Sequence, residues 1–159
     1  RLWDIFRQQN LQILTSHADY TGDDLGEEWV VFLRKNLPLS RAMISRALDM
    51  IRVASLLKTN QTKLAVLSYR HARLLFAGVP PFDQFSPLRL EVLIDNGKYL
   101  LVARPSLPLQ HGFMITAALM KDAEKLQLVN PTKGKFGMAV HAGSKAFFNG
   151  EQIEIPKKL

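Results

Sequence analysis

The chain contains no cysteine. This absence excludes disulfides, cysteine-ligated zinc and thiol nucleophiles. It also fits a reducing compartment, so we expect a cytoplasmic protein. No apolar run approaches the roughly 18 residues that a membrane span needs, and we therefore expect no contact with a membrane. No continuous apolar stretch follows Arg1, which argues against a signal peptide. Because the first residue is not methionine, we expect the chain to be part of a longer protein.

Recognisable catalytic and metal-binding motifs are missing as well. The four histidines are scattered, and no pair has the spacing that places two metal ligands on one helix face. The acidic residues from Asp19 to Glu28 lack the alternating oxygen ligands of a calcium loop, so capping and solvation of a loop explain them better. The nucleophile-elbow and phosphate-loop patterns are also absent. We therefore predict no enzyme activity, no metal and no cofactor.

Positive charge is abundant and is concentrated in one segment. The 159 residues carry a net charge of +7, and 47% of them are hydrophobic, which is enough to form a core. Residues 34–73 contain nine lysines and arginines against Asp49 alone, a net charge of +8, whereas residues 1–33 carry −4. Such an asymmetry calls for a polyanionic partner or a structural reason.

The N-terminal third reads as helical. Apolar residues of 1–14 fall near one helix face, which predicts an amphipathic helix there. Asp24 followed by Glu27 has the form of a capping box and predicts a second helix over about 26–36. Pro38 ends that helix, because proline lacks an amide hydrogen and pushes the preceding residue out of the helical region.

Residues 41–56 give the strongest helical periodicity in the chain. Apolar residues from Met43 to Leu57 fall on one broad side at 100° per residue, and Arg41 and Arg52 fall on the other. Ser40 is the expected N-cap. One face is therefore predicted to pack and the other to be wet and basic.

The rest of the chain mixes short strands with helices. Asn96-Gly97 is the preferred two-residue turn of a hairpin, because both positions tolerate positive φ. Further expected elements are a strand over 63–69, one or two helical turns over 70–77, a proline-containing linker over 78–87, hairpin strands over 88–94 and 98–104, a helix over 113–129, and strands over 135–140 and 146–155.

The order helix, short turn, helix, then a polar turn into a strand occurs within residues 27–69. The stretch LPLSRAMISRALDMIRVASLLKTNQTKLAVLSY resembles winged helix-turn-helix proteins of the bacterial regulator and plasmid or phage replication type. This resemblance implies that the second helix enters the major groove and that the following hairpin touches the backbone. The residues it implies as nucleic-acid contacts are Arg34, Lys35, Ser40, Arg41, Ser45, Arg46, Arg52, Lys58, Asn60 and Lys63.

These observations predict an α+β protein. We expect an N-terminal winged helix-turn-helix over 1–77, a linker over 78–87, and a small mixed α/β domain with β-hairpins over 88–159, which would supply oligomerisation or effector sensing. The predicted function is non-catalytic binding of double-stranded DNA, as a transcriptional regulator or a replication or partition factor of a bacterial or mobile genetic element. Such proteins often act as homodimers. The alternatives are a protein–protein interaction or RNA-binding module within a larger assembly, with the basic helix face merely solvated.

Overall fold

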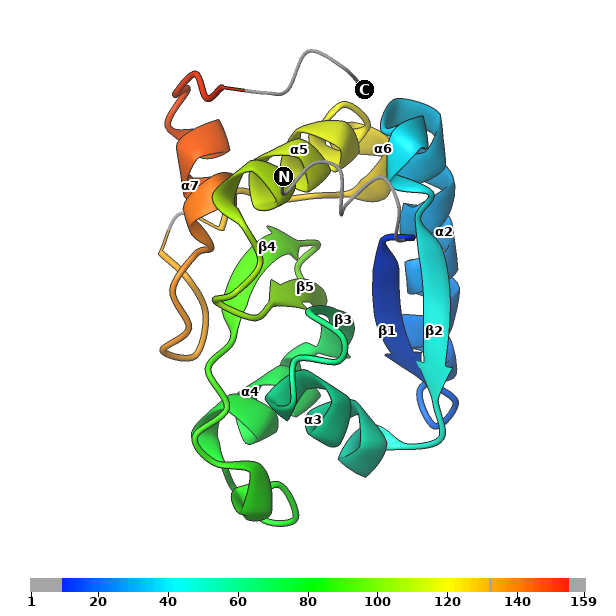
Figure 1. The fold of residues 1–159 in the computed structure, drawn as a ribbon, viewed down its shortest axis with the longest axis vertical. Coiled ribbons are helices and arrows are strands. Elements are labelled where there is room, and N and C mark those ends of the chain that lie inside the picture. The colour runs from blue at the N-terminus through cyan, green and yellow to red at the C-terminus, as the bar shows by residue number, and fades with distance from the viewer. Residues whose placement is uncertain (1–9, 132, 155–159) are drawn as a thin grey trace.

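A five-stranded mixed sheet forms the centre of the molecule (Figure 1). The structure is a computed structural model, and it describes residues 10–131 and 133–154. The strands are β1 (Gln12–Ser16), β2 (Met43–Ala47), β3 (Leu64–Ser68), β4 (Glu91–Asp95) and β5 (Tyr99–Ala103). Their order across the sheet is β2-β1-β3-β5-β4. β1 is parallel to both β2 and β3, whereas β5 is antiparallel to β3 and β4.

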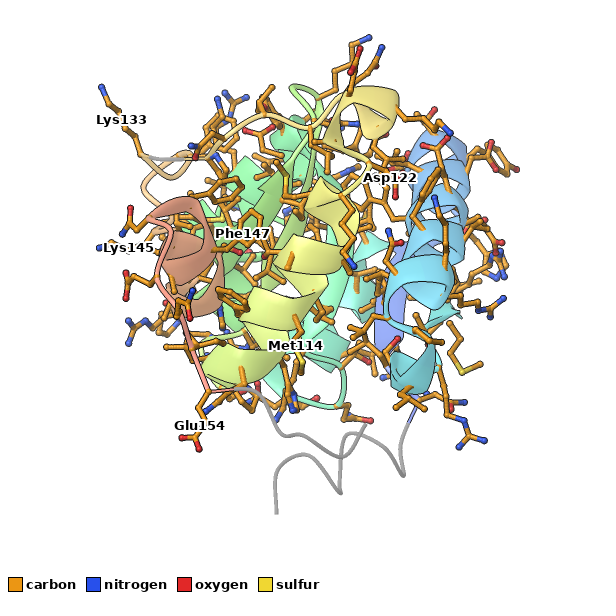
Figure 2. The ribbon with its side chains drawn as sticks, turned by 90° about the horizontal axis from the view of Figure 1, so that it is seen from above. Met114, Asp122, Lys133, Lys145, Phe147 and Glu154 are labelled. Atoms are coloured by element: carbon orange, nitrogen blue, oxygen red, sulfur yellow. The ribbon has the colours of Figure 1, made fainter. Side chains whose placement is uncertain are left out.

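Helices cover both faces of this sheet. The α-helices are α2 (Tyr20–Asn36), α3 (Met50–Lys58), α4 (Tyr69–Ala77), α5 (Leu109–Met120), α6 (Ala123–Leu126) and α7 (Ala142–Phe148), and the short 3-10 helices are η1 (Pro38–Ser40) and η2 (Asp83–Phe85). α2, α5 and α7 pack on one face, and α3 and α4 pack on the other. Figure 2 shows α5 and α7 side by side, where the rings of Phe113 and Phe147 meet edge to face at 5.8 Å.

The core has two layers because successive strand residues point to opposite faces. Ile13 and Val66 pack with α2 and α5, whereas their neighbours Leu14 and Leu67 pack with α3 and α4. β1 and β3 lie inside the sheet, so both of their faces are covered. This explains why β3, with four apolar residues in succession from Leu64 to Leu67, does not alternate between apolar and polar residues.

Several predicted elements are confirmed. β4 and β5 form the antiparallel hairpin around Asn96-Gly97, and β3 occupies most of the strand predicted at 63–69. The helix predicted at 26–36 is the second half of α2, but its predicted start is wrong. α2 begins at Tyr20, and its cap is Asp19, whose side chain accepts a hydrogen bond from the Gly22 N–H at 3.1 Å.

The helix predicted over 41–56 is wrong in its first half. Residues 43–47 form β2, and α3 starts only after Asp49, whose carboxylate accepts the Arg52 N–H at 2.9 Å. Ser40 is no N-cap; it is buried and donates its hydroxyl to the Leu37 carbonyl. Pairing with the buried β1 overrides the local helical pattern, as tertiary context often does. Because β2 separates α2 from α3, the structure does not confirm the winged helix-turn-helix arrangement.

The remaining differences concern the two ends of the chain. Of the helix predicted at 1–14, residues 1–9 lie outside the described residues, and the rest runs into β1. The predicted strand at 146–155 is wrong where it overlaps α7. The predicted strand at 135–140 is reduced to two isolated bridges, one between Lys135 and Met138 and one from Val140 to Val92 of β4. The helix predicted at 113–129 is divided between α5 and α6.

The predicted linker at 78–87 connects two parts of one sheet. β3, which precedes it, pairs with β5, which follows it, from Leu64↔Ala103 to Ser68↔Tyr99. One hydrophobic cluster also contains residues from both sides of this segment. The segment therefore does not separate two cores. Within the described residues, no helix combines the length and the apolar character needed to cross a bilayer.

Candidate functional site

The strand order reverses between β1 and β3. From β1 the chain crosses through α2 to β2 on one side, and from β2 it returns through α3, past β1, to β3 on the other side. α2 and α4, which follow these two adjacent parallel strands, pack on opposite faces. In open α/β sheets a crevice forms at such a reversal, outside the carboxyl ends of the strands, and ligands bind there.

Asp19 is the central polar group on the β1 side of this reversal. Its carboxylate caps α2 and also accepts a hydrogen bond from the Tyr99 hydroxyl at 2.9 Å. Burial raises the pKa of Tyr99 to about 12, and the bond to Asp19 acts in the same direction. Gly22 makes this arrangement possible, because a Cβ there would lie 2.5 Å from the Asp19 carboxylate and 3.1 Å from the Tyr99 ring.

Ser68 and His71 face this group from the β3 side. The Ser68 hydroxyl caps α4 by accepting the His71 N–H at 3.1 Å, and it lies 3.1 Å from Nδ1 of the same histidine. Burial lowers the pKa of His71, while the negative charge of Asp19 acts in the opposite direction. Ser68 is also the register partner of Tyr99. Asp19, Ser68, His71 and Tyr99 are called the carboxyl-edge cluster below.

A second carboxylate, Asp95, lies nearby at the end of β4. It is 1% exposed and accepts hydrogen bonds from the Tyr69 hydroxyl and the Gly97 N–H. Burial raises the pKa of Tyr69, and the bond to Asp95 adds to that effect. The Lys135 ammonium lies 4.0 Å from Asp95 and 5.0 Å from the centre of the Tyr69 ring. Asp95 is thus already neutralised and bonded, whereas the carboxyl-edge cluster is only partly buried.

The residues predicted from the sequence to contact nucleic acid do not form one surface, and several already have partners. Ser40 is fully buried. Arg34 donates to the Ala42 carbonyl at 2.8 Å, and Lys35 forms an ion pair with Asp122 at 3.4 Å. These residues lie near the amino ends of the parallel strands, opposite the carboxyl-edge cluster.

Arg46 and Lys58 are also engaged. Arg46 on β2 turns toward α2, where it pairs with Asp23 at 2.8 Å and with Glu27. Although burial opposes it, hydrogen bonds from Thr15 and Arg46 hold the pKa of Asp23 below its usual value. The Lys58 ammonium donates to a backbone carbonyl in the segment before β4.

Asn60 and Lys63 lie in the loop between α3 and β3, where a wing was predicted. The Asn60 side-chain oxygen accepts hydrogen bonds from Arg104 and Ser106, so Asn60 fastens this loop to the end of β5. Lys63 is half-buried, whereas Arg41 is exposed and has a left-handed φ of 52°. Contact of any of these residues with nucleic acid stays a prediction.

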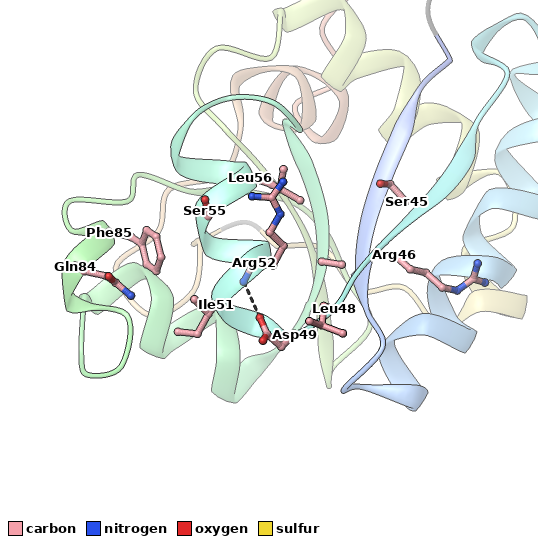
Figure 3. Close-up of a pocket in the computed structure, with 11 residues that line it drawn as sticks. Ser45, Arg46, Leu48, Asp49, Ile51, Arg52, Ser55, Leu56, Gln84 and Phe85 are labelled. Atoms are coloured by element: carbon pink, nitrogen blue, oxygen red, sulfur yellow. Dashed lines mark hydrogen bonds between the residues drawn. The ribbon is translucent and has the colours of Figure 1, made fainter.

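Ser45 and Arg52 share an open groove of 730 Å³, called the β2 groove (Figure 3). Its lining comes from β2, from α3 and the turn before it, and from Gln84 and Phe85 of η2. Figure 3 shows the Arg52 guanidinium turned away from Asp49 and toward Ser55 and Leu56. Within the described residues this guanidinium has no ion pair and no hydrogen bond.

Within residues 10–131 and 133–154, no three histidines, aspartates or glutamates are placed to hold a metal ion together. Comparisons with known proteins found no matching family model, no similar curated protein and no similar solved structure.

Proposed function

We propose that the chain is a ligand-binding domain that takes a small polar molecule at the carboxyl-edge cluster. The observation that carries this proposal is the reversal of strand order between β1 and β3, which brings Asp19 and His71 together although 52 positions separate them in the sequence. Crevices of this kind are the usual ligand sites of open α/β sheets.

The chemistry of the cluster favours a ligand that donates hydrogen bonds. Asp19 accepts from Tyr99 and from Gly22, and an ionised carboxylate has further lone pairs available. The first free amides of α2 and α4 already bond to their own caps, so they do not determine the ligand. We therefore infer a ligand that carries hydroxyl or amino groups.

A thermal-shift screen of the whole chain tests this proposal. The probes are polyols, sugars, amino acids and polyamines, with mono- and dicarboxylates as a contrasting class. A compound present at about 100 times its Kd stabilises the protein by about 2.7 kcal/mol, which raises Tm by several degrees. We expect a hit among the hydroxyl or amino compounds.

Matched variants connect such a hit to the site. Asp19→Asn removes the charge but keeps a good N-cap, so the fold is preserved and binding is weakened. Asp24→Asn, on the exposed side of the same helix, makes the same charge change away from the cluster and leaves binding unchanged. Equal binding to both variants, or no hit in any class, would refute the proposal.

Binding of double-stranded DNA is a second candidate. It is supported by the exposed guanidinium groups of Arg41 and Arg52, for which no ion pair exists within the described residues. Fluorescence anisotropy with duplex DNA at two salt concentrations tests it, because phosphate contacts make affinity fall steeply with salt. Replacing both arginines by alanine weakens binding by about 1–3 kcal/mol each if they contact bases. No binding at low salt removes this candidate.

A further inference from the structure

β2 is an edge strand whose outer side is open over part of its length. Met43 donates its N–H to the Leu11 carbonyl, and the Ala47 carbonyl accepts from His17, so these residues direct their backbone groups toward β1. Since alternate residues face opposite edges, Ile44 and Arg46 direct theirs outward. Within the described residues, no strand pairs with this outer edge.

The free stretch of this edge has a defined beginning. Ala42 is two positions before Ile44, so its carbonyl also points to the outer edge. This carbonyl already accepts a hydrogen bond from the Arg34 side chain at 2.8 Å. Among the residues that the structure describes, the N–H and C=O of Ile44 and Arg46 therefore have no partner strand. Ile44 and Arg46 are two positions apart, which is the spacing at which an added strand forms backbone hydrogen bonds with an edge strand. Both residues lie beside the β2 groove.

We propose that this edge binds an extended segment of a partner polypeptide by strand addition, with an acidic side chain of that segment on Arg52. Backbone hydrogen bonds supply the affinity in this mode, and alternate side chains supply the specificity. The side chain of the added strand that lies beside Ser45 projects to the α3 side of the sheet. There it meets the groove in which the Arg52 guanidinium makes no ion pair with any described residue and is turned away from Asp49.

The apolar part of the groove fixes the next position of the partner. Two residues along the added strand, the side chain beside Ala47 also projects to the α3 side, toward Ile51 and Leu48, and Leu48 is 77% exposed. A second copy of this chain fits less well, because its own Arg46 and Arg52 would come to the same edge and repel. The partner segment is therefore extended, acidic at one position and apolar two positions away.

Labelled peptides of about six residues, built from threonine and valine with one glutamate, test the proposal by fluorescence anisotropy. Arg46→Pro removes one outward N–H, and Arg46→Ala is its matched control, since both lose the ion pairs with Asp23 and Glu27. We expect Arg46→Pro to bind about tenfold more weakly than Arg46→Ala. A second test uses the wild-type chain and a peptide methylated on the backbone nitrogens that face β2, which cannot donate hydrogen bonds to this edge. We expect it to bind more weakly than the unmethylated peptide, and this result does not depend on how the proline variant folds.

The charge is tested by a double-mutant cycle. Arg52→Gln and replacement of the peptide glutamate by glutamine each weaken binding about tenfold, and the two changes together weaken it hardly more than one alone. If the two Arg46 variants bind the peptide equally and the methylated peptide binds as tightly as the unmethylated one, strand addition is overturned. If the effects of Arg52→Gln and of the glutamate replacement on binding simply add, the assignment of the acidic side chain to Arg52 is overturned. No binding of any peptide overturns the whole inference. Sedimentation gives a further refuting outcome. If the wild type and Arg46→Ala form a dimer and Arg46→Pro does not, the edge binds a second copy of this chain and the inference of a different partner is overturned.

Discussion

The stability of this fold is expected to fall between pH 7 and pH 4 because of one buried histidine. His111 on α5 is 8% exposed, and burial lowers its pKa to about 4, with the positive charge of Lys63 acting in the same direction. In the unfolded chain the pKa of histidine is about 6.5. Between these values the unfolded state binds the extra proton and the folded state does not, so the free energy of unfolding decreases as pH falls.

The magnitude follows from the two pKa values. The loss is about 1.4 kcal/mol per pH unit between them and reaches about 3 kcal/mol at pH 4. His111→Gln keeps a polar side chain that does not titrate, so its stability curve lacks this slope. Carboxylates with a lowered pKa, such as Asp23 and Asp122, lose their contribution mainly below this window and do so in both proteins.

Urea unfolding at several pH values measures this effect. The difference in unfolding free energy between wild type and His111→Gln should shrink by about 3 kcal/mol from pH 7 to pH 4. Parallel curves for the two proteins would show that His111 takes up its proton in the folded state as easily as in the unfolded one, and the reasoning from burial would then fail. His71→Gln should change the slope in the same direction, since burial also lowers the pKa of His71.

Two glycine substitutions test how closely the layers pack. In Gly22→Ala the new Cβ displaces the Asp19 carboxylate, so Tm falls although alanine favours a helix by about 1 kcal/mol. Absorbance titration shows the pKa of Tyr99 falling below about 12 but staying above about 10, because burial, the larger cause of the shift, remains; an unchanged tyrosine titration contradicts this. In Gly143→Ala the Cβ meets the backbone of Phe113, which cannot swing aside, so the contact of α7 with α5 costs about 1–3 kcal/mol in chemical unfolding; wild-type stability contradicts this.

The hairpin of β4 and β5 could be predicted because its information is local. Asn96-Gly97 selects a tight turn whatever the rest of the chain does, and the flanking residues alternate or run apolar as strands do. β2 could not be predicted in this way. Its pairing partner β1 lies about thirty positions away, and residues 43–57 on their own have a helical period.

Asp49 was nevertheless a usable indication. Aspartate is a poor residue inside a helix and a good one at its N-cap, and its position there divides the 41–56 stretch into a strand and a helix. Once β2 is a strand, the chain reads as alternating strands and helices. That pattern predicts a parallel sheet with its ligand site at the carboxyl ends of the strands.

The carboxyl-edge cluster was missed for the same reason. Polar residues lie at and just after the ends of two strands, at Thr15 to Asp19 and at Ser68 to His71, which is where parallel strands present their functional groups. Recognising them as one site requires that β1 and β3 are neighbours. The sequence does not state this, because β2 intervenes between them in the chain but not in the sheet.

The positive charge of residues 34–73 shows how a property of a segment changes on folding. The acidic α2 lies against β2, so Asp23 and Glu27 form ion pairs with Arg46, and Asp122, between α5 and α6, forms an ion pair with Lys35. Within the described residues, seven basic residues of this segment have no ion pair, and they are spread over α2, α3, α4 and the connecting loops: Arg34, Arg41, Arg52, Lys58, Lys63, Arg70 and Arg73. The basic residues therefore do not lie together on a single helix that could enter a DNA groove. Arg52 instead stands alone beside an unpaired strand edge, which suits one carboxylate of an extended partner better than a row of phosphates, and the salt dependence of binding separates the two.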